Sequence, residues 1–233
     1  MRGLLGRLAR RGPDAARYPE GPVRDLVAAA PDADAPLAGA ALLAVDLETT
    51  GLDPEADAVV AVGWVPVVDG SVLLGEARHR VVRPPAGTQV GDSAALHGIT
   101  DDALAHAPPL ADVLPELLAA LRGRVLLAHH APVELGFLGR AVRTSYGCDL
   151  PVTTVDTMRL QHRLLAGGHG EVPPGALRLD GCRRHFGLPR YRAHDALTDA
   201  LATAELLLAQ AAELGRRRGR PLTLADLGAT RQG

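Results

Sequence analysis

The first half of the chain contains three apolar runs separated by turn signals. Residues 41–48 form a largely apolar run that ends at Thr49-Thr50-Gly51, which is typical of a buried strand that stops at a turn. Residues 58–68 are apolar and rich in valine, and Asp69-Gly70 offers a tight turn into residues 71–82. The pattern therefore predicts three strands that form an antiparallel meander.

The second half changes to the spacing of helices, interrupted by two short apolar strands. Leucine and valine recur at helical intervals over residues 110–121, and a later helix is predicted from about Asp195 to Leu214. Three antiparallel strands followed by alternating helices and strands predict an α/β fold, in which a mixed sheet is flanked by helices. The remaining predicted elements are a strand at 124–129, a strand or loop at 152–156, and helices from Pro132, at 157–165 and at 176–186.

The two ends of the chain lack this periodicity. Residues 1–36 contain five prolines and begin with an arginine-rich run, which predicts a basic, proline-rich appendage and linker. That run lacks the long apolar region of a signal peptide, so a loosely ordered tail is favoured over an amphipathic helix that touches a partner. Residues 215–233 predict a basic C-terminal tail. The main domain is expected to span residues 37–214.

Composition narrows the possible settings. The 233 residues suffice for one well-buried core, and no apolar stretch approaches the roughly 18 residues of a membrane span, so we expect no membrane association. Cys148 and Cys182 predict free thiols in a reducing cytoplasm, because nothing in the sequence indicates export. The formal net charge of −2 argues against coating long nucleic acid through a broad basic face. It is compatible with holding a single chain end in a metal-lined cleft.

Two acidic residues stand at the end of the first predicted strand. Asp46 and Glu48 are two positions apart, so their side chains project from the same face of the strand. Two like charges beside a buried run reduce stability unless a cation or another partner neutralises them. A strand end already in water is the alternative. The burial of the run favours a metal-binding pair.

Glu134, His194 and Asp199 are further candidates, each with an ordinary explanation. Glu134 falls in the first turn of a predicted helix, where the helix dipole alone favours an acid. Asp199 lies one turn beyond Asp195, too far into its helix for that explanation, so either a metal or an arginine salt bridge accounts for it. His194 precedes the same helix and is either functional or a helix cap.

Taken together, these segments resemble the DnaQ-like 3′–5′ exonucleases of the DEDDh type, the group that includes the proofreading subunit of bacterial DNA polymerase III. The resemblance covers about residues 42–212 and implies a ribonuclease H-like fold, with 37–214 as the exonuclease domain. It rests on segments that occur in the family's order, namely Asp46 to Pro54, His97 to Thr100, His129 to Leu138, Val155 to Thr157, and His194 with Asp199.

The resemblance implies a role for each candidate. Carboxylates are suitable ligands for hard cations, and the family would use four of them to hold two Mg²⁺ or Mn²⁺ ions that promote phosphodiester hydrolysis. His194 would be the general base, since an imidazole titrates near neutral pH, and the products would be nucleoside 5′-monophosphates released from a 3′ end. The implied metal ligands are Asp46, Glu48, Glu134 and Asp199, and the implied contacts to the last nucleotide are Thr50, Gly51, Leu52 and His97.

Two positions depart from the family's pattern. The family has aspartate where Glu134 stands and commonly asparagine where His130 stands. The extra methylene of glutamate changes the reach of the carboxylate, and catalytic metal sites are sensitive to displacements of about 0.5 Å. Either the backbone has adjusted and the enzyme is fully active, or the chain is a weakened module that binds 3′ ends and cleaves poorly.

The expected partners are single-stranded nucleic-acid 3′ ends, of DNA or RNA. The sequence does not distinguish the two, because the family binds both through the same terminal pocket. About 19 residues follow the last predicted helix, which argues against stable attachment to a polymerase through a long C-terminal extension. The basic termini leave a third reading open, a scaffold that engages a repair or replication assembly.

Overall fold

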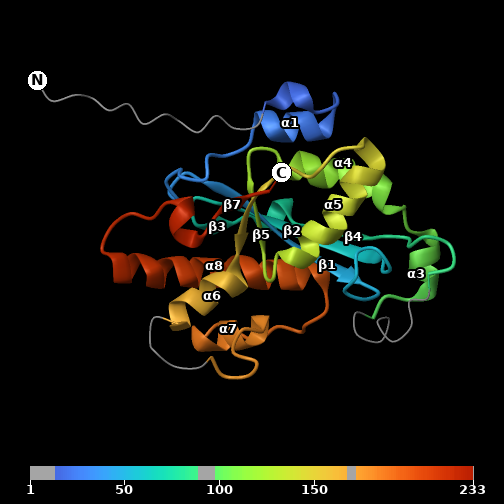
Figure 1. Ribbon diagram of the computed structural model, residues 1–233. Helices are drawn as coiled ribbons and strands as arrows, with labels where there is room; N and C mark the ends of the chain where they lie inside the picture. The colour runs from blue at the N-terminus through green and yellow to red at the C-terminus, as the bar shows by residue number, and fades with distance from the viewer. Residues whose placement is uncertain (1–13, 89–97, 167–171, 233) are drawn as a thin grey trace, which may run out of the picture.

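A seven-stranded mixed sheet forms the centre of the described part of the chain (Figure 1). The computed structural model describes residues 14–88, 98–166 and 172–232. The strand order is β3-β2-β1-β5-β6-β7, with β4 also paired to β2; β1, β5 and β6 are parallel, and the β1–β2 and β6–β7 pairs are antiparallel. The strands are β1 Ala41–Thr49, β2 Val59–Val68, β3 Ser71–Val72, β4 Arg78–Val81, β5 Val125–Ala128, β6 Thr153–Asp156 and β7 Thr230–Arg231.

The third strand of the predicted meander is divided in two. Residues 71–82 contain β3 and β4, separated by the short 3-10 helix η2, Leu74–Glu76. Both pieces pair with β2, which is ten residues long and offers one register near its end and another near its middle. The meander is therefore confirmed, but its last strand leaves the sheet around Gly75.

Helices cover both faces of the sheet. In Figure 1, α1, α4 and α5 lie above the sheet, and α6, α7 and α8 lie below it. No described helix is long and apolar enough to cross a membrane. The helices are α1 Pro22–Ala28, α3 Asp101–His106, α4 Leu110–Leu121, α5 Pro132–Tyr146, α6 Thr157–Ala166, α7 Leu179–His185 and α8 Ala196–Arg218, with 3-10 helices η1 Ala15–Arg17 and η3 Leu224–Leu227.

The alternation of β1 supplies a separate core to each layer of helices. Leu43, Val45 and Leu47 belong to the cluster that packs against α4 and α5. Leu42 and Ala44 belong to the cluster on the opposite face, which includes residues of α6 and α8. Asp46 and Glu48 continue this second series, so the alternation directs both acids toward α8.

The described parts of the two terminal segments are more ordered than the sequence predicts. The expected linker contains α1, whose Val23 and Leu26 are buried in the cluster that includes α4. The last helix ends at Arg218 and not at 214, and Leu224 and Leu227 of η3 pack into the core beyond it. Burial of these side chains favours folding of both segments onto the sheet. The domain boundaries at 36 and 214 stay predictions.

Candidate metal centre

Three carboxylates meet beside the end of β1. Ligand oxygens of Asp46, Glu48 and Asp199 all lie within 4.8 Å of one another. The first two project from the same face of β1, and the third comes from the start of α8. The site therefore forms where the parallel strands end, the usual place for a binding site in an α/β sheet.

A glycine on the neighbouring strand brings Asp199 to this position. Gly63 of β2 lies directly opposite Asp46 in the antiparallel register. A Cβ atom at Gly63 would lie 2.2 Å from the carbonyl carbon of Ala196 and 2.3 Å from the nitrogen of Leu197. The first turn of α8 thus rests on the backbone of β2, a close approach that a side chain at position 63 would prevent.

The segment before α8 orients Asp199 through its backbone. His194 has a left-handed backbone, with φ of 66°, and its N–H donates to Oδ2 of Asp199 at 2.8 Å. The helix cap is Asp195, which accepts from the N–H of Thr198 at 2.8 Å, so the sequence-based alternative of a capping His194 is wrong. The imidazole of His194 is exposed, and no arginine salt bridge to Asp199 occurs within the described residues.

Glu134 approaches the cluster from the other layer of helices. It lies in the first turn of α5, is 3% exposed, and its Oε2 has no hydrogen-bond partner in the described structure. The start of α5 is held close to the loop after β1, because a Cβ at Gly136 would lie 3.0 Å from the Pro54 ring. Glu134 therefore offers a buried and unsatisfied oxygen next to Asp46, although it lies outside the group of three.

The carboxylates raise one another's proton affinity. Burial, followed by repulsion from Glu134 and Asp199, raises the pKa of Asp46 well above its ordinary value. Burial, with repulsion from Asp199 and Asp195, raises the pKa of Glu48 to about 7, and burial raises the pKa of Glu134 to about 8. Buried acids with too little positive charge nearby fit the oxygen-rich environment of a hard divalent cation.

Asp156, an acid outside the carboxylate cluster, holds the backbone around the site. Its Oδ1 accepts from the N–H groups of His130, Met158 and Arg159, and its Oδ2 accepts from that of Ala131, at 2.9–3.2 Å. It therefore ties the turn after β5 to the start of α6. His130 has a left-handed φ of 74° in this turn, a conformation that histidine and asparagine both adopt more readily than most residues.

The sequence alone did not predict the structural roles of Asp156 and Asp195, which hold the backbone beside the site. The Asp-Thr pair after a short strand and the Asp-x-x-Thr pattern at the start of α8 are the local signals that a search for helix caps would have found. Asp195 also raises the pKa of Glu48, so it belongs to the electrostatic environment of the site. Its own pKa is lowered: burial alone would raise it, but the hydrogen bonds from Thr198 outweigh that effect.

The four residues predicted to contact a terminal nucleotide differ in their surroundings. The hydroxyl of Thr50 contacts Oδ1 of Asp57 at 3.2 Å, and a Cβ at Gly51 would collide with that carboxylate. Both residues therefore shape the loop after β1. Leu52 projects from the loop with 80% of its surface exposed. The fourth predicted contact, His97, lies outside the described residues.

Two pockets of different character adjoin the carboxylates. A pocket of about 300 Å³ is lined by two acids, by the histidines His79 and His194, and by the segment Gly98 to Thr100. A larger one of about 870 Å³ contains four arginines. Glu48 and Asp195 line the first pocket, Asp199 lines the second, and His194 lines both. The carboxylate cluster thus adjoins both a pocket that holds acids and histidines and a pocket that holds four arginines.

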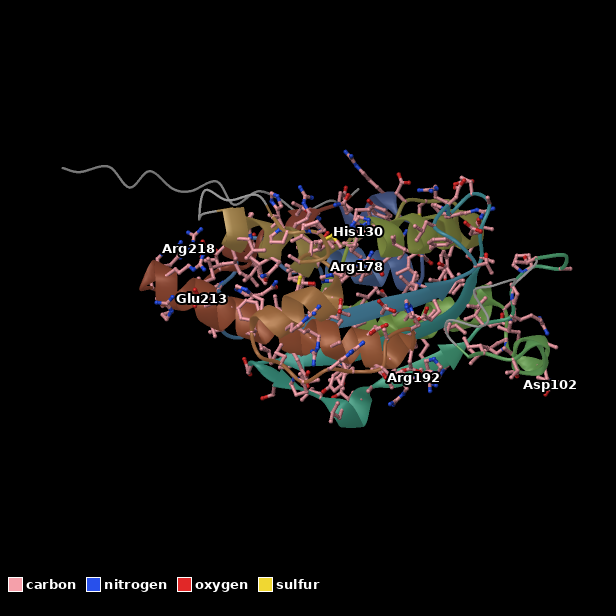
Figure 2. All side chains as sticks on the ribbon, turned by 90° about the horizontal axis from the view of Figure 1, so that it is seen from below. Asp102, His130, Arg178, Arg192, Glu213 and Arg218 are labelled. Atoms are coloured by element: carbon pink, nitrogen blue, oxygen red, sulfur yellow. The ribbon has the colours of Figure 1, made fainter. Side chains whose placement is uncertain are left out.

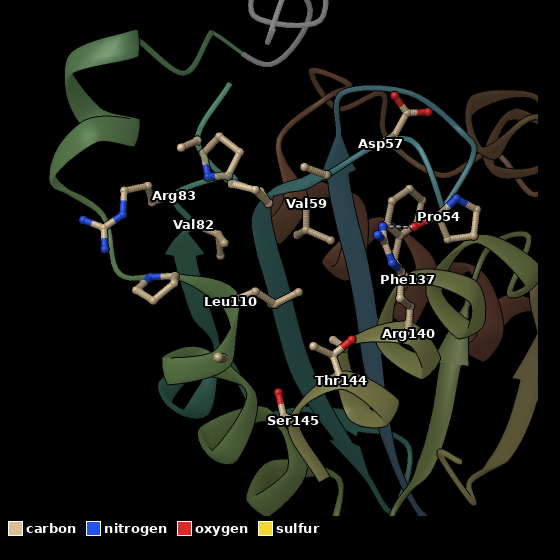
Figure 3. Close-up of a pocket in the computed structure, with 17 residues that line it drawn as sticks. Pro54, Asp57, Val59, Val82, Arg83, Leu110, Phe137, Arg140, Thr144 and Ser145 are labelled. Carbon is tan, nitrogen blue, oxygen red and sulfur yellow. Dashed lines mark hydrogen bonds between the residues drawn. The ribbon is translucent and has the colours of Figure 1, made fainter. Parts of the chain in front are cut away.

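A third pocket, of about 430 Å³, is mainly apolar and is not lined by any acid of the carboxylate cluster (Figure 3). Val59, Val82, Leu110 and Phe137 line it, between the sheet and helices α4 and α5. At its rim, Arg140 of α5 donates to the carbonyl oxygen of Pro54. This contact holds the loop after β1 against α5, the helix that carries Glu134. The pocket therefore borders a contact that positions Glu134.

The raised pKa values predict that the metal-free protein loses stability with rising pH. Glu48 and Glu134 keep their protons in the folded protein at pH values at which the unfolded chain has released them. The free energy of unfolding should therefore fall between about pH 5 and pH 8, by on the order of a few kcal/mol. Urea denaturation in EDTA across this range measures the effect. Millimolar Mn²⁺ should raise the melting temperature more at pH 8 than at pH 5, and unchanged stability in EDTA would contradict the prediction.

The family comparison matches most of the chain. The family model RNase_T, described as an exonuclease, matches residues 43–207. The PolC-type DNA polymerase III of Thermotoga petrophila is 30% identical over 175 residues, which is 75% of this chain and 12% of that protein. The DNA polymerase III subunit epsilon of Treponema pallidum is 27% identical over 179 residues, 77% of this chain and 80% of that protein. The chain thus spans a small part of the PolC-type relative.

Solved structures share the fold. Exonuclease X in complex with 5′ overhanging duplex DNA is 24% identical with a TM-score of 0.57, covering 80% of this chain and 98% of that one. The nuclease domain of 3′hExo, a DEDDh family member bound to rAMP, is 19% identical with a TM-score of 0.64. The match covers 77% of this chain and 95% of that one. The expected ribonuclease H-like α/β fold is confirmed.

Proposed function

Because the chain belongs to the RNase T exonuclease family, we propose that it is a metal-dependent 3′–5′ exonuclease. It hydrolyses phosphodiester bonds at the 3′ end of single-stranded DNA or short RNA and releases nucleoside 5′-monophosphates. The convergence of Asp46, Glu48 and Asp199, with buried Glu134 beside them, is the observation that carries this proposal.

The two pockets beside the carboxylates support the 3′ polarity. When the scissile phosphate lies at the carboxylates, a 3′-terminal nucleotide carries no other phosphate and ends in a hydroxyl. Such a group suits the smaller pocket, where Glu48 and Asp195 would repel an additional phosphate. The rest of the strand carries a phosphate at each nucleotide and suits the arginine-rich pocket. The reverse orientation would place a 5′ phosphate against acids.

The donor set fits a pair of divalent cations. Asp46, Glu48 and Asp199 would hold one ion, and Glu134 with Asp46 would contribute to the other. When bound, Mg²⁺ or Mn²⁺ would supply Lewis-acid stabilisation of the negative charge that develops on the phosphate and the leaving 3′ oxygen. The raised pKa values of the acids support this assignment, because cations would remove the mutual repulsion that raises them.

His194 is the proposed general base. Its imidazole is exposed at the junction of the two pockets, where a ring nitrogen can take the proton of an attacking water. The backbone N–H of His194 is bonded to Asp199, so the side chain is free to turn while its Cα stays fixed. Asp199 thereby couples the position of the base to the carboxylate cluster.

His194→Ala tests the polarity and the base together. With Mg²⁺ or Mn²⁺, the wild-type protein should shorten a 5′-labelled single strand one nucleotide at a time and release 5′-monophosphates. Loss of a general base should lower the rate by about 10²–10⁴-fold. Denaturing gels and chromatography of the mononucleotides measure both results. His106→Ala, which replaces an exposed histidine of α3, is the matched control and should keep full activity. Removal of nucleotides from the 5′ end would contradict the proposal.

A second candidate function follows from Glu134. Its ligand oxygens lie outside the group of three, so the longer side chain would hold a second ion less well than the other acids hold the first. The chain would then be a 3′-end binding module with weak cleavage. Oligonucleotide binding without turnover in either metal, and turnover restored by Glu134→Asp, would favour this function over the first.

The proposed function places the protein in DNA replication or repair and in the cytoplasm. The relatives named as DNA polymerase III proteins support a place in DNA replication or repair, while the expected absence of a stable polymerase attachment stays a prediction. Cys148 and Cys182 are free thiols, which supports the predicted cytoplasmic location.

A further inference from the structure

We propose that Arg178, Arg184 and Arg190 form an arginine groove that binds the phosphates of the strand on the 5′ side of the scissile bond. The proposal rests on the proposed function, because it assigns the path of the uncleaved strand. Figure 2 views the molecule from below the view of Figure 1, which is the side of α7, and labels Arg178. The ligand class is a single-stranded nucleic acid with at least one phosphate beyond the scissile one.

The groove is continuous with the carboxylate cluster. It has a volume of about 870 Å³ and runs from Arg178 and Arg184, beside and on α7, past Arg190 to His194 and Asp199. Leu52, which is 80% exposed, and Met158 also line it. A strand in the groove would therefore meet both guanidinium groups, suited to its phosphates, and apolar surface, suited to the faces of its bases.

The three arginines are available to a ligand. Arg178 and Arg190 are exposed, and within the described residues neither makes a hydrogen bond or an ion pair through its guanidinium. Arg184 pairs with Asp180 one turn earlier, at 3.1 Å, but both side chains are more than half exposed. Such a surface pair is worth little and gives way readily to a phosphate. All three guanidinium groups can therefore engage phosphate oxygens in the two-pronged manner typical of arginine.

The fourth arginine of the groove has a different role. Arg183 is buried, donates to the carbonyl oxygens of Ala202 and Pro189, and pairs with Glu205 at 2.8 Å. Its guanidinium lies 4.4 Å from the ring centroid of Tyr191, whose hydroxyl also donates to Glu205. This ion pair ties α7 to α8 and fixes the segment that carries Arg190. The groove is thus preorganised, which reduces the entropy lost on binding.

The charge distribution explains why such a groove is needed. The chain has a formal net charge of −2, and the acidic carboxylate cluster alone would repel a polyanion. Three cations placed next to the cluster supply local attraction without a basic face over the whole protein. The groove therefore selects strands long enough to reach it, and a dinucleoside monophosphate, whose only phosphate is the scissile one, gains nothing from it.

The double variant Arg178→Ala/Arg190→Ala tests the groove. Fluorescence anisotropy with labelled dT10 in EDTA should show an increase in Kd of about tenfold or more. The slope of log Kd against log salt should fall by about 1.4, since each phosphate contact to a single strand contributes about 0.7. In Mg²⁺, KM for dT10 should rise while kcat/KM for the dinucleoside monophosphate TpT stays at the wild-type value.

Arg17→Ala/Arg122→Ala is the matched control, because it removes two exposed arginines at η1 and at the end of α4, on the far side of the sheet. It should leave dT10 binding unchanged. Unchanged binding and salt slope in the groove variant would overturn the groove, as would an equal loss of activity on dT10 and TpT. If the wild-type protein cleaves neither substrate, the proposed function fails, whereas the anisotropy measurement still decides the groove.

Discussion

Asp46→Asn is expected to abolish nuclease activity and, at the same time, to raise the stability of the metal-free protein. The carboxylate of Asp46 is repelled by Glu134, Asp199, Glu48 and Asp195, and it is partly buried. Asparagine keeps the shape and removes the charge. The rate of hydrolysis should fall by ~10³-fold or more, because the other acids of the site surround the carboxylate oxygens of Asp46.

The gain in stability should be largest above neutral pH. At pH 8, removing one negative charge from the cluster should raise the free energy of unfolding by on the order of 1 kcal/mol or more. In a domain of this size that corresponds to a rise in melting temperature of about 2–4 °C per kcal/mol. The stabilisation by Mn²⁺ should disappear in the same variant. Calorimetry in EDTA and in Mn²⁺ measures these changes.

Asp112→Asn serves as the control for this variant, because Asp112 is an exposed acid of α4 away from the site. It should change neither activity nor the response to Mn²⁺. A large loss of stability in Asp46→Asn would show that the charge of Asp46 is satisfied by the protein itself. That outcome would contradict a site built to receive a cation.

Gly63→Ala should impair the site without changing any acid. The new methyl carbon would lie 2.2 Å from the Ala196 carbonyl carbon, and because this neighbour is backbone it cannot rotate away. The first turn of α8 must then move off β2, which withdraws Asp199 from Asp46. A displacement of about 1 Å at a reacting centre reduces the rate by about 10²-fold. Overpacking should lower the free energy of unfolding by about 1–3 kcal/mol.

Gly75→Ala is the matched substitution, since no atom of the described residues lies within 4 Å of a Cβ at that position. Activity should be measured well below the melting temperature of each variant, together with the increase in melting temperature produced by Mn²⁺. Gly63→Ala should lose most of that increase, and Gly75→Ala should keep it. Wild-type activity in Gly63→Ala would show that the contact between β2 and α8 does not determine the position of Asp199.

Local pattern was sufficient for most of the sheet and for part of the site. The apolar run along residues 41–48 predicts the strand, and the spacing of Asp46 and Glu48 predicts their shared face, because side chains two apart on a strand must point the same way. The leucine spacing at 110–121 predicts α4 to the residue. These features depend on neighbours in the chain, which a sequence displays directly.

Features that depend on contacts between distant segments were not predictable. The apolar part of the N-terminal segment is short, so α1 follows from its packing on α4 and not from periodicity. Strand β7 is two residues long and exists because β6 offers an unpaired edge. Neither leaves a recognisable local pattern.

The sequence by itself determined which residues can bind a cation, since carboxylate identity and strand alternation are local properties. Only the tertiary structure decided that Asp199 joins Asp46 and Glu48. That meeting requires a glycine at position 63 and a helix start at Ala196, which lie far apart in the chain and touch through their backbones. Close packing of this kind has no periodicity, so it is settled when the layers of the fold come together.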